Sequence, residues 1–345
     1  MYDIRIESID LSTNDRLKVE SFLSTFNLLL DKDVEHTIVA RYEGEIIGTC
    51  SYSGKVLKCF AVKEGYQEQG IASRLITHIT NQLFDRGIYS SFIFTEPKNI
   101  TLFKRLNYRE VQSVDEVVLL EGGMSNIKKY VEEMFKDSDL NKNKKAALVM
   151  NCNPFTLGHR YLIERAAGEN DEVIVFVVEE DRSLFPFEVR KNLVSIGIED
   201  LKNVHVLSGG SYIISSNTFP SYFLRQEDMR MNAYAKLDAE IFGRYFSSVF
   251  NIERRYVGTE PYCNMTKQYN EALHSILPKY GIDVMEVDRL SKEDKPISAS
   301  EVRRLIKADK FHIIKNLVPK VTYEFLMSNE AKLIIEKIKR SDSSH

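Results

Sequence analysis

Short apolar runs separated by polar and glycine residues fill the first 120 residues of the chain. One stretch instead has its apolar residues at helical spacing, which predicts a helix over residues 70–84. The remaining patterns predict strands at 2–7, 37–42, 46–52, 56–62, 91–95, around Val111 and at 117–120, with a short helix at 99–106. Strands that are mostly sequential neighbours, with few helices among them, indicate an α+β unit.

Residues 121–145 differ in character and mark a boundary. Apolar residues at helical spacing over 127–135 predict an amphipathic helix. The run KDSDLNKNKK that follows is polar, as expected of a solvated linker rather than of a phosphate-binding segment. We therefore expect a first domain at 1–124, a linker helix and polar linker at 125–145, and a second domain at 146–345.

From Ala146 the chain alternates strands with helices. The patterns predict strands at 146–150, 173–178, 204–207, 255–258 and 284–287, and helices between 311 and 340. This alternation is typical of an α/β fold with a doubly wound, parallel, Rossmann-like sheet. Ligands of such sheets bind at the carboxyl ends of the strands, near the point where the strand order reverses.

The composition narrows the class of protein. A chain of 345 residues favours two domains over one. Hydrophobic residues make up 43% and charged residues 28%, as in soluble globular proteins, and no stretch has the apolar length of a membrane span. The start MYDIRIESID is unlike a signal peptide, so we expect a cytoplasmic location. A net charge of -3, with both signs interspersed, gives no basic footprint for nucleic acid.

The four cysteines are Cys50, Cys59, Cys152 and Cys263. They show no C-x-x-C spacing and no nearby histidine cluster, which argues against a zinc site and against a disulfide framework. We expect the four cysteines to be reduced and to serve as small residues of the core. The sequence also contains no carboxylate cluster dedicated to a metal ion.

The strongest chemical signal is NPFTLGHRYLIERA at residues 153–166, directly after a predicted strand. Gly158 lets the backbone approach a ligand, and a helix is expected from about Leu157, whose free N–H groups and positive dipole end suit a phosphate. Thr156 and His159 lie on its first turn and can both donate hydrogen bonds to one phosphate oxygen. The alternative is an ordinary helix with Thr156 as its N-cap and His159 on the surface.

This stretch resembles the H-x-G-H or T-x-G-H motif of the nucleotidylyltransferase superfamily, with Thr156 at the position of the first histidine. That superfamily directs an acceptor oxygen to the α-phosphorus of a nucleotide and releases pyrophosphate. The resemblance implies His159 and Thr156 as catalytic residues, and Asn153, Phe155 and Gly158 as nucleotide-binding residues. We assign no general base, because positioning and charge neutralisation supply most of the acceleration in this chemistry.

A second segment, PISASEVR at residues 296–303, is similar to the late I-S-S-T-x-x-R motif of the same superfamily. A serine-rich turn that opens a helix supplies hydrogen-bond donors, and Arg303 supplies a cation for phosphates. The alternative is a capping motif with a surface arginine. The resemblance implies Arg303 as catalytic and, as nucleotide-binding, Ser298, Ser300, Gly258, Thr259, Glu260 and Arg190. For Arg190 a plain surface role is the alternative.

In the first half, QEQGIA at residues 67–72 lies between a predicted strand and a predicted helix. It resembles the loop of GNAT acetyltransferases whose backbone amides hold the pyrophosphate of coenzyme A. NITLFKRLNY at 99–108 resembles the last helix and strand of that family. The resemblance implies that a coenzyme A-like arm contacts Gln67, Gln69, Gly70 and Ala72. Relatives often have a tyrosine acid where this chain has Phe103, so binding of the arm is implied rather than acetyl transfer to an amine.

A GNAT-like domain followed by a T-x-G-H domain, over nearly the whole chain, resembles the citrate (pro-3S)-lyase ligase family of acid–thiol ligases. The resemblance implies ATP as the nucleotide, with Mg²⁺ held mainly through water and substrate oxygens. Acetate would be activated as acetyl-adenylate with release of pyrophosphate. The acetyl group would then pass to the thiol of the dephospho-coenzyme A-derived prosthetic group on the acyl carrier subunit of citrate lyase, with release of AMP.

Other classes stay open on the sequence alone. One is a cofactor-biosynthetic adenylyltransferase for a mononucleotide or phosphopantetheine, fused to a GNAT acetyltransferase. Another treats the N-terminal half as a non-catalytic docking module for a carrier protein. A class I aminoacyl-tRNA synthetase shares the H-x-G-H motif, but the chain lacks its tRNA-binding length and basic surface. The aromatic residues of SNTFPSYFLR, 216–225, could wall an acetate pocket, although a place in an ordinary core is favoured.

Overall fold

The computed structural model describes residues 3–12, 14–179, 182–214, 219, 221–224, 226–259, 264–292 and 295–341. Two compact units divide the chain: Met1–Tyr130 with Pro220–Leu237, and Val131–Phe219 with Asp238–His345. Each unit has its own sheet and its own apolar core. Two of the three boundaries between the units fall within the helices α4 (Ile127–Asp137) and α7 (Glu227–Ile241), and the third falls between Phe219 and Pro220.

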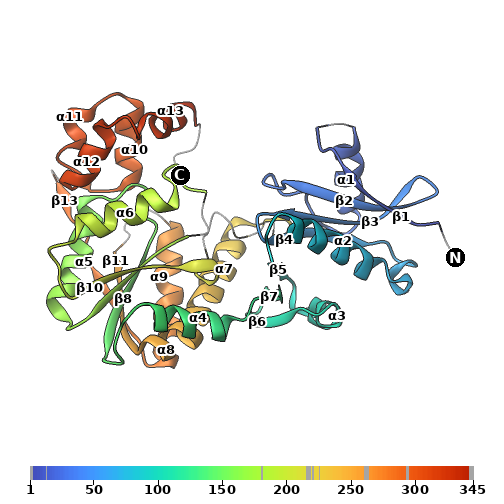
Figure 1. Ribbon diagram of the computed structural model, residues 1–345, viewed down its shortest axis with the longest axis horizontal. Coiled ribbons are helices and arrows are strands. Elements are labelled where there is room, and N and C mark those ends of the chain that lie inside the picture. The colour runs from blue at the N-terminus through green and yellow to red at the C-terminus, as the bar shows by residue number, and fades with distance from the viewer. Residues whose placement is uncertain are drawn as a thin grey trace. The chain divides into compact units, whose positions relative to one another are not determined.

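A seven-stranded sheet forms the centre of the first unit, in the order β1-β2-β3-β4-β5-β7-β6 (Figure 1). Neighbouring strands are antiparallel, except that β4 and β5 are parallel. The strands are β1 (Arg5–Ile9), β2 (His36–Tyr42), β3 (Glu45–Ser53), β4 (Val56–Val62), β5 (Ser90–Thr95), β6 (Arg109–Ser113) and β7 (Val118–Gly123). The helices are α1 (Asp15–Ser24), α2 (Ile71–Asp85) and α3 (Ile100–Arg105), with short 3-10 turns η1 (Gln67–Gln69) and η2 (Pro97–Asn99).

Apolar side chains cover both faces of this sheet. Successive residues of β2 point to opposite faces, with Ile38 in the core under α2 and Val39 in the core under α1. Leu75 and Ile79 of α2 join the first core, and Leu23 of α1 joins the second. The helix predicted over 70–84 is confirmed as α2, because its apolar spacing matches the stripe that faces the sheet.

Strands β4 and β5 pair only at their start, through Val56 with Phe92 and Leu57 with Ile93. Beyond these pairs the two strands part. Cys59 of β4 adopts a left-handed backbone, with φ +51°, and the register between β3 and β4 shifts opposite this point. Such a bulge bends a strand and re-aims its neighbours, so it accounts for the gap that opens in the sheet.

Residues 221–224 and the start of α7 pack with the first unit, although they follow the third strand of the second half. Tyr222 is 6% exposed and, with Phe223, joins the core under α1. This division differs from the expected sequence of domains, because residues 146–345 do not form one continuous unit. The physical reason is the burial of these aromatic side chains in the first unit.

A five-stranded parallel sheet forms the centre of the second unit, in the order β10-β9-β8-β11-β12. Its strands are β8 (Lys145–Met150), β9 (Val173–Val177), β10 (Val204–Ser208), β11 (Ile252–Gly258) and β12 (Asp283–Val287), and a hairpin joins β13 (Ser291–Lys292) to β14 (Lys295–Pro296). The order reverses between β8 and β11, so the doubly wound α/β prediction is confirmed and the expected ligand edge lies where these two strands end.

Helices cover both faces of the second sheet (Figure 1). On one face α5 (Leu157–Glu169) and α6 (Phe187–Gly197) share a core with alternate residues of β8 and β9. On the other face the ring of Phe176 contacts Phe242, Phe246 and Phe250 at centroid distances of 5.5–6.1 Å. The remaining elements are η3 (Gly210–Tyr212), the π-helical turn η4 (Phe242–Phe246), α8 (Ser247–Phe250), α9 (Asn264–Ile276) and η5 (Leu277–Tyr280).

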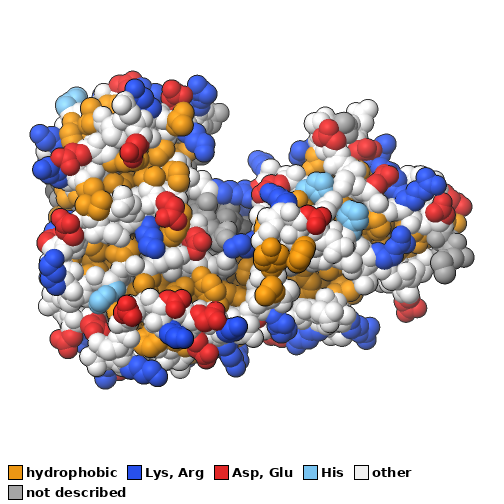
Figure 2. Space-filling model, in the orientation of Figure 1, with side chains coloured by type: hydrophobic (Ala, Val, Ile, Leu, Met, Phe, Trp, Pro, Cys, Tyr) orange, Lys and Arg blue, Asp and Glu red, His pale blue; other side chains and the backbone are white. Residues whose placement is uncertain are grey.

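Four C-terminal helices, red in Figure 1, form a separate apolar core around Phe185. They are α10 (Ala299–Lys307), α11 (Phe311–Ile314), α12 (Lys320–Met327) and α13 (Lys332–Arg340), and the last three confirm the helical prediction for 311–340. Within the described part of the chain, no helix combines the length and apolarity needed to cross a bilayer. Acidic and basic side chains are interspersed on the described surface that Figure 2 shows.

Candidate active site

The loop after β8 ends in a closed capping box at the start of α5. The Thr156 hydroxyl accepts a hydrogen bond from the His159 N–H at 3.3 Å, and the Thr156 N–H donates to His159 Nδ1 at 3.1 Å. In most capping boxes a glutamate or glutamine completes this pair, whereas here the imidazole does. The box fixes the ring orientation of His159 relative to the helix N-terminus.

The imidazole of His159 is held in one neutral form. Because Nδ1 accepts a hydrogen bond, the ring proton of the neutral imidazole lies on Nε2. Burial, together with a smaller contribution from the charge of Arg289, lowers the pKa of His159 to about 4. At neutral pH His159 therefore offers a neutral N–H donor rather than a positive charge.

Thr156 and Phe155 support His159 from behind. Thr156 is 1% exposed and its hydroxyl lies 3.0 Å from His159 Nδ1, so it faces the imidazole instead of sharing an anion with it. Phe155 is fully buried, and its ring lies nearly parallel to the imidazole at a centroid distance of 6.1 Å. This geometry favours positioning roles for both residues, and their catalytic and nucleotide-binding assignments stay predictions.

The second motif opens α10 in the same manner as the first opens α5. Ser298 is the N-cap, and its side chain accepts a hydrogen bond from the Glu301 N–H at 3.2 Å. Ser300 is exposed on the first turn. Arg303 is buried, so the alternative of a surface arginine does not hold.

The two motifs contact each other directly. Arg303 Nη1 donates to the carbonyl oxygen of Asn153 at 2.5 Å. A Cβ atom on Gly158 would lie 2.7 Å from the carbonyl oxygen of Ile297, closer than real Cβ contacts allow. The helix start that carries His159 and the turn that leads to Arg303 can therefore approach only because residue 158 is glycine.

Arg190 forms hydrogen bonds with the loops that surround this contact. Its guanidinium donates to the carbonyl oxygens of Asn151, Val178 and Phe185 at 2.7–3.0 Å, and it is 1% exposed. The Asn153 side chain also accepts from the Phe185 N–H at 3.1 Å. A plain surface role for Arg190 is excluded, and its geometry favours positioning of the loops after β8 and β9; nucleotide contact stays a prediction.

The end of β11 lies at the same edge of the sheet. Asn270 Nδ2 donates to the Gly258 carbonyl at 3.1 Å, and Arg289 Nε donates to the Thr259 carbonyl at 2.7 Å. Thr259 and Asn270 also line an open hollow of about 540 Å³. Glu260, the third residue predicted here, lies outside the described residues.

Arg289 is a candidate that the motifs missed. It follows the end of β12, its Nε donates to the Thr259 carbonyl oxygen at the end of β11, and its charge contributes to the lowered pKa of His159. The available sequence signal was a basic residue two positions after a predicted strand. Together with Arg303 it gives this edge a donor set suited to a polyphosphate. Among the residues with described positions, no group of three His, Cys, Asp or Glu side chains is arranged for a metal ion.

In the first unit the predicted phosphate loop lies at the start of α2. Gln67 and Gln69 form η1, and Gly70 has φ +72°, a left-handed conformation that favours glycine. Gln67 and Ala72 line a cavity of about 440 Å³ in the gap between β4 and β5. The loop thus borders a cavity, as a site for a coenzyme A-like arm requires.

No free tyrosine acid replaces the missing one among the described residues around Phe103. The nearby Tyr108 is buried, its hydroxyl pairs with the Ser91 hydroxyl at 2.7 Å, and burial raises its pKa. Tyr222 and Phe223 of the suggested acetate pocket lie in the first unit's core, in agreement with the favoured interpretation. Residues 216–218, 220 and 225 of that stretch lie outside the described residues.

Family matches agree with this two-unit structure. Residues 145–326 match the citrate lyase ligase C-terminal domain, and residues 5–108 match the acetyltransferase (GNAT) family. A solved acetyltransferase of the GNAT family from Staphylococcus aureus Mu50 covers 35% of this chain and 99% of its own, at 16% identity and a TM-score of 0.31. The matched families define a class of two-domain enzymes, a GNAT unit followed by a ligase unit.

Three relatives named citrate (pro-3S)-lyase ligase match across most of their length. The Escherichia coli K12 protein is 36% identical over 317 residues, 90% of this chain and 90% of its own. The Klebsiella pneumoniae protein is 35% identical over 90% of this chain and 92% of its own, and the Haemophilus influenzae Rd protein is 33% identical over 94% and 98%. The chain therefore belongs to the citrate lyase ligase family.

Replacement of Gly158 tests the contact between the motifs. Gly158→Ala should lower ligase turnover by about a hundredfold, since a shift of roughly 1 Å at a catalytic group has that effect. Gly168→Ala is the matched control, because its new Cβ lies in the same helix with no atom within 4 Å. The control should gain about 0.5–1 kcal/mol of unfolding free energy and keep its turnover. Equal turnover in both variants would contradict the proposed contact.

Removal of the imidazole tests His159. His159→Ala should lower turnover by about a hundred- to thousandfold, as does loss of one donor to a developing charge. His312→Ala, on an exposed position of α11, is the control and should have no effect on the rate. Steady-state kinetics of both variants under saturating substrates measure the difference.

His159 should also make the free energy of unfolding in urea depend on pH. Its pKa of about 4 in the folded chain lies below the roughly 6.5 of an unfolded histidine. Between these values the unfolded chain binds a proton that the folded chain does not. The stability due to His159 should therefore be complete above about pH 6.5 and decline towards pH 4. His159→Gln should show a shallower decline than the wild type, and parallel curves would contradict the pKa assignment.

Proposed function

We propose that this chain activates acetate with ATP and acetylates the prosthetic-group thiol on the acyl carrier subunit of citrate lyase. In the first step a carboxylate oxygen of acetate bonds to the α-phosphorus, and the bond to the bridging oxygen breaks as pyrophosphate leaves. In the second step the sulfur of the dephospho-coenzyme A-derived arm bonds to the acetyl carbon. The bond to AMP breaks, and the thiol proton passes to water.

The contact between the two motif segments is the observation that carries this proposal. It brings the N-terminus of α5, the Nε2–H of His159 and the charge of Arg303 to the edge where β8 ends. These groups suit the charge that develops on phosphate oxygens during transfer. Acetate is already ionised at neutral pH, so the first step needs no general base.

Arg289 is proposed as a second cation for the nucleotide phosphates, because it lies beside His159 and Thr259. Mg²⁺ would bind with the nucleotide, through water and phosphate oxygens, and neutralise charge on the departing pyrophosphate. Asn153, Thr156 and Arg190 act through the backbone positions and ring orientation that they hold. The names of the relatives support citrate lyase as the target.

The first unit is proposed to hold the arm of the carrier during transfer. The loop at Gln67–Ala72 precedes α2, whose first N–H groups lack partners within the helix and suit a phosphate. The adjoining cavity has Phe103 in its wall and no free tyrosine acid among the described residues, which suits binding better than catalysis.

Pyrophosphate exchange into ATP tests the first step. We expect exchange that depends on acetate and is absent with a mononucleotide or phosphopantetheine in its place. Acetate is the acceptor of the proposed adenylyl transfer, so only acetate lets the reversible step run. Exchange that requires a phosphorylated acceptor would instead support the cofactor-biosynthetic alternative.

A substitution in the phosphate loop tests the first unit's role. Gly70→Glu should weaken binding of dephospho-coenzyme A by at least roughly tenfold, because a carboxylate would face the phosphates. Gly87→Glu is matched for backbone strain, since both glycines have φ above +70° and no atom within 4 Å of a new Cβ. Isothermal titration should show near wild-type affinity for the control. Acetate-dependent exchange should be unchanged in both variants, and unchanged affinity in Gly70→Glu would overturn this role.

A further inference from the structure

The cavity in the first unit has a defined closed end. Its volume is about 440 Å³, within the range of small-molecule sites. Its exposed lining residues are Gln67, Lys98 and Leu102 on the side of α2 and α3, and Asn27 after α1. Leu57 and Ile93 lie at the other end, where β4 and β5 are still paired.

The distance between the two ends of the cavity suits an extended coenzyme A-like arm. Val62 lies five residue steps after Leu57 in β4, which corresponds to about 17 Å along a strand. The phosphate loop follows Val62 within a few residues. An arm with its phosphates at this loop therefore brings its terminal thiol near the closed end, and the parted strands border it with backbone amides along the way.

Tyr222 lies at that closed end. Its hydroxyl donates to the carbonyl oxygen of Phe94, the residue that directly follows the paired Ile93 of β5. The rings of Tyr222 and Phe223 meet edge to face at a centroid distance of 4.9 Å, and both line the cavity. These two residues come from the segment that follows β10 and η3 in the chain, so they form a wall that the GNAT-like sequence alone does not supply.

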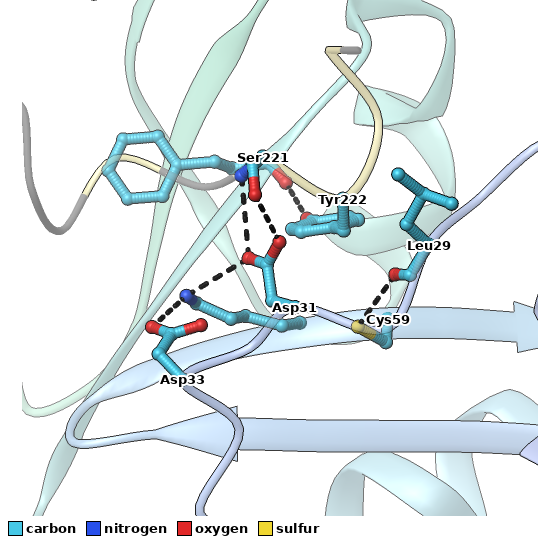
Figure 3. Close-up of polar contacts among 8 residues, drawn as sticks. Leu29, Asp31, Asp33, Cys59, Ser221 and Tyr222 are labelled. Carbon is cyan, nitrogen blue, oxygen red and sulfur yellow. Dashed lines mark hydrogen bonds and ion pairs between the residues drawn. The ribbon is translucent and has the colours of Figure 1, made fainter. Parts of the chain in front are cut away.

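A buried polar anchor fixes this wall to β4, as Figure 3 shows. Ser221 Oγ donates to Asp31 Oδ1 at 2.6 Å, and the Leu29 N–H donates to the Tyr222 carbonyl at 3.0 Å. Asp31 also pairs with Lys58 at 3.1 Å, and Lys58 is the β4 residue next to Leu57.

Asp33 is the second partner of Lys58, so two carboxylates compensate this buried ammonium group. Asp31 and Lys58 are 6% and 2% exposed. The ion pairs fix the position of Asp31, and the hydrogen bond from Ser221 to Asp31 holds the segment to it. The anchor therefore holds Tyr222 and Phe223 in place at the cavity lining.

We infer that Tyr222, with Phe223 beside it, is a specificity-determining wall that limits the acyl group on the thiol to a short one such as acetyl. This inference rests on the proposed role of the first unit as the holder of the arm. The acetyl thioester fits between the ring and the strand ends. A longer acyl chain meets the aromatic rings, which the anchor prevents from moving aside. The hydroxyl of Tyr222 is already engaged with Phe94, so the ring, and not the hydroxyl, sets the limit.

Titration of the full chain with dephospho-coenzyme A and with its acetyl and hexanoyl thioesters tests this wall. The wild type should bind the acetyl thioester about as well as the free thiol, and the hexanoyl thioester at least roughly tenfold more weakly. Tyr222→Ala should reduce this difference to about threefold or less, mainly through tighter hexanoyl binding. Equal wild-type affinities for both thioesters would overturn the inference and leave arm binding intact. Absence of any dephospho-coenzyme A binding would overturn both proposals.

Two further variants separate the wall from general damage to the fold. Tyr222→Phe keeps the ring and loses the hydroxyl, so it should retain the discrimination between the two thioesters. Tyr222→Leu removes less of the side chain than Tyr222→Ala and should also reduce the discrimination between the two thioesters. Phe84→Ala, an aromatic residue 63% exposed on α2, should match the wild type. Binding of free dephospho-coenzyme A reports whether the first unit is folded in each variant. Unchanged discrimination in a Tyr222→Leu variant that binds the free thiol normally would overturn the inference.

Discussion

The absence of a side chain at residue 158 is the constraint on which the second unit's chemistry depends. The start of α5 and the turn before α10 are brought together across about half of the unit's sequence, and they meet backbone against backbone at Gly158 and Ile297. Arg303 then reaches the Asn153 carbonyl, 150 residues away in the chain. The arginine, the N-terminus of α5 and the imidazole of His159 lie at one edge of the sheet only because this approach is possible.

Much of the fold follows from local patterns. Buried parallel strands are short apolar runs, so the five strands of the second sheet could be predicted, although β11 begins at Ile252 rather than at Arg255. Helix α1 gave a weaker signal, because its buried residues are Val19 and Leu23 while Leu17 is 66% exposed. The return of Tyr222 to the first unit could not be predicted, because periodicity tells which residues are buried but not against which partner.

The candidate site, like the fold, could be predicted only in part from the sequence. Motif spacing singled out Gly158, His159 and Arg303, which lie near one another in the structure, while their roles stay predictions. It could not distinguish a residue that touches a ligand from one that orients its neighbour. Thr156 illustrates this, because its exposure is set by packing around the capping box rather than by its place in the motif. Arg289 had no motif at all, and only the parallel alignment of β11 with β12 brings it to Thr259.

The interleaved course of the chain has a consequence during synthesis. The first unit needs residues 220–237 to complete the core under α1, yet its other residues end at Tyr130. At about 5–20 residues per second, a ribosome reaches Leu237 on the order of 5–20 s after it passes Tyr130. During that interval Tyr222 and Phe223 have not yet been synthesised. The hydrogen bond from Ser221 to Asp31 has therefore not formed. The nascent first unit must therefore stay soluble while incomplete, and the GNAT half of the gene cannot be cut out as a free-standing domain without leaving part of its core behind.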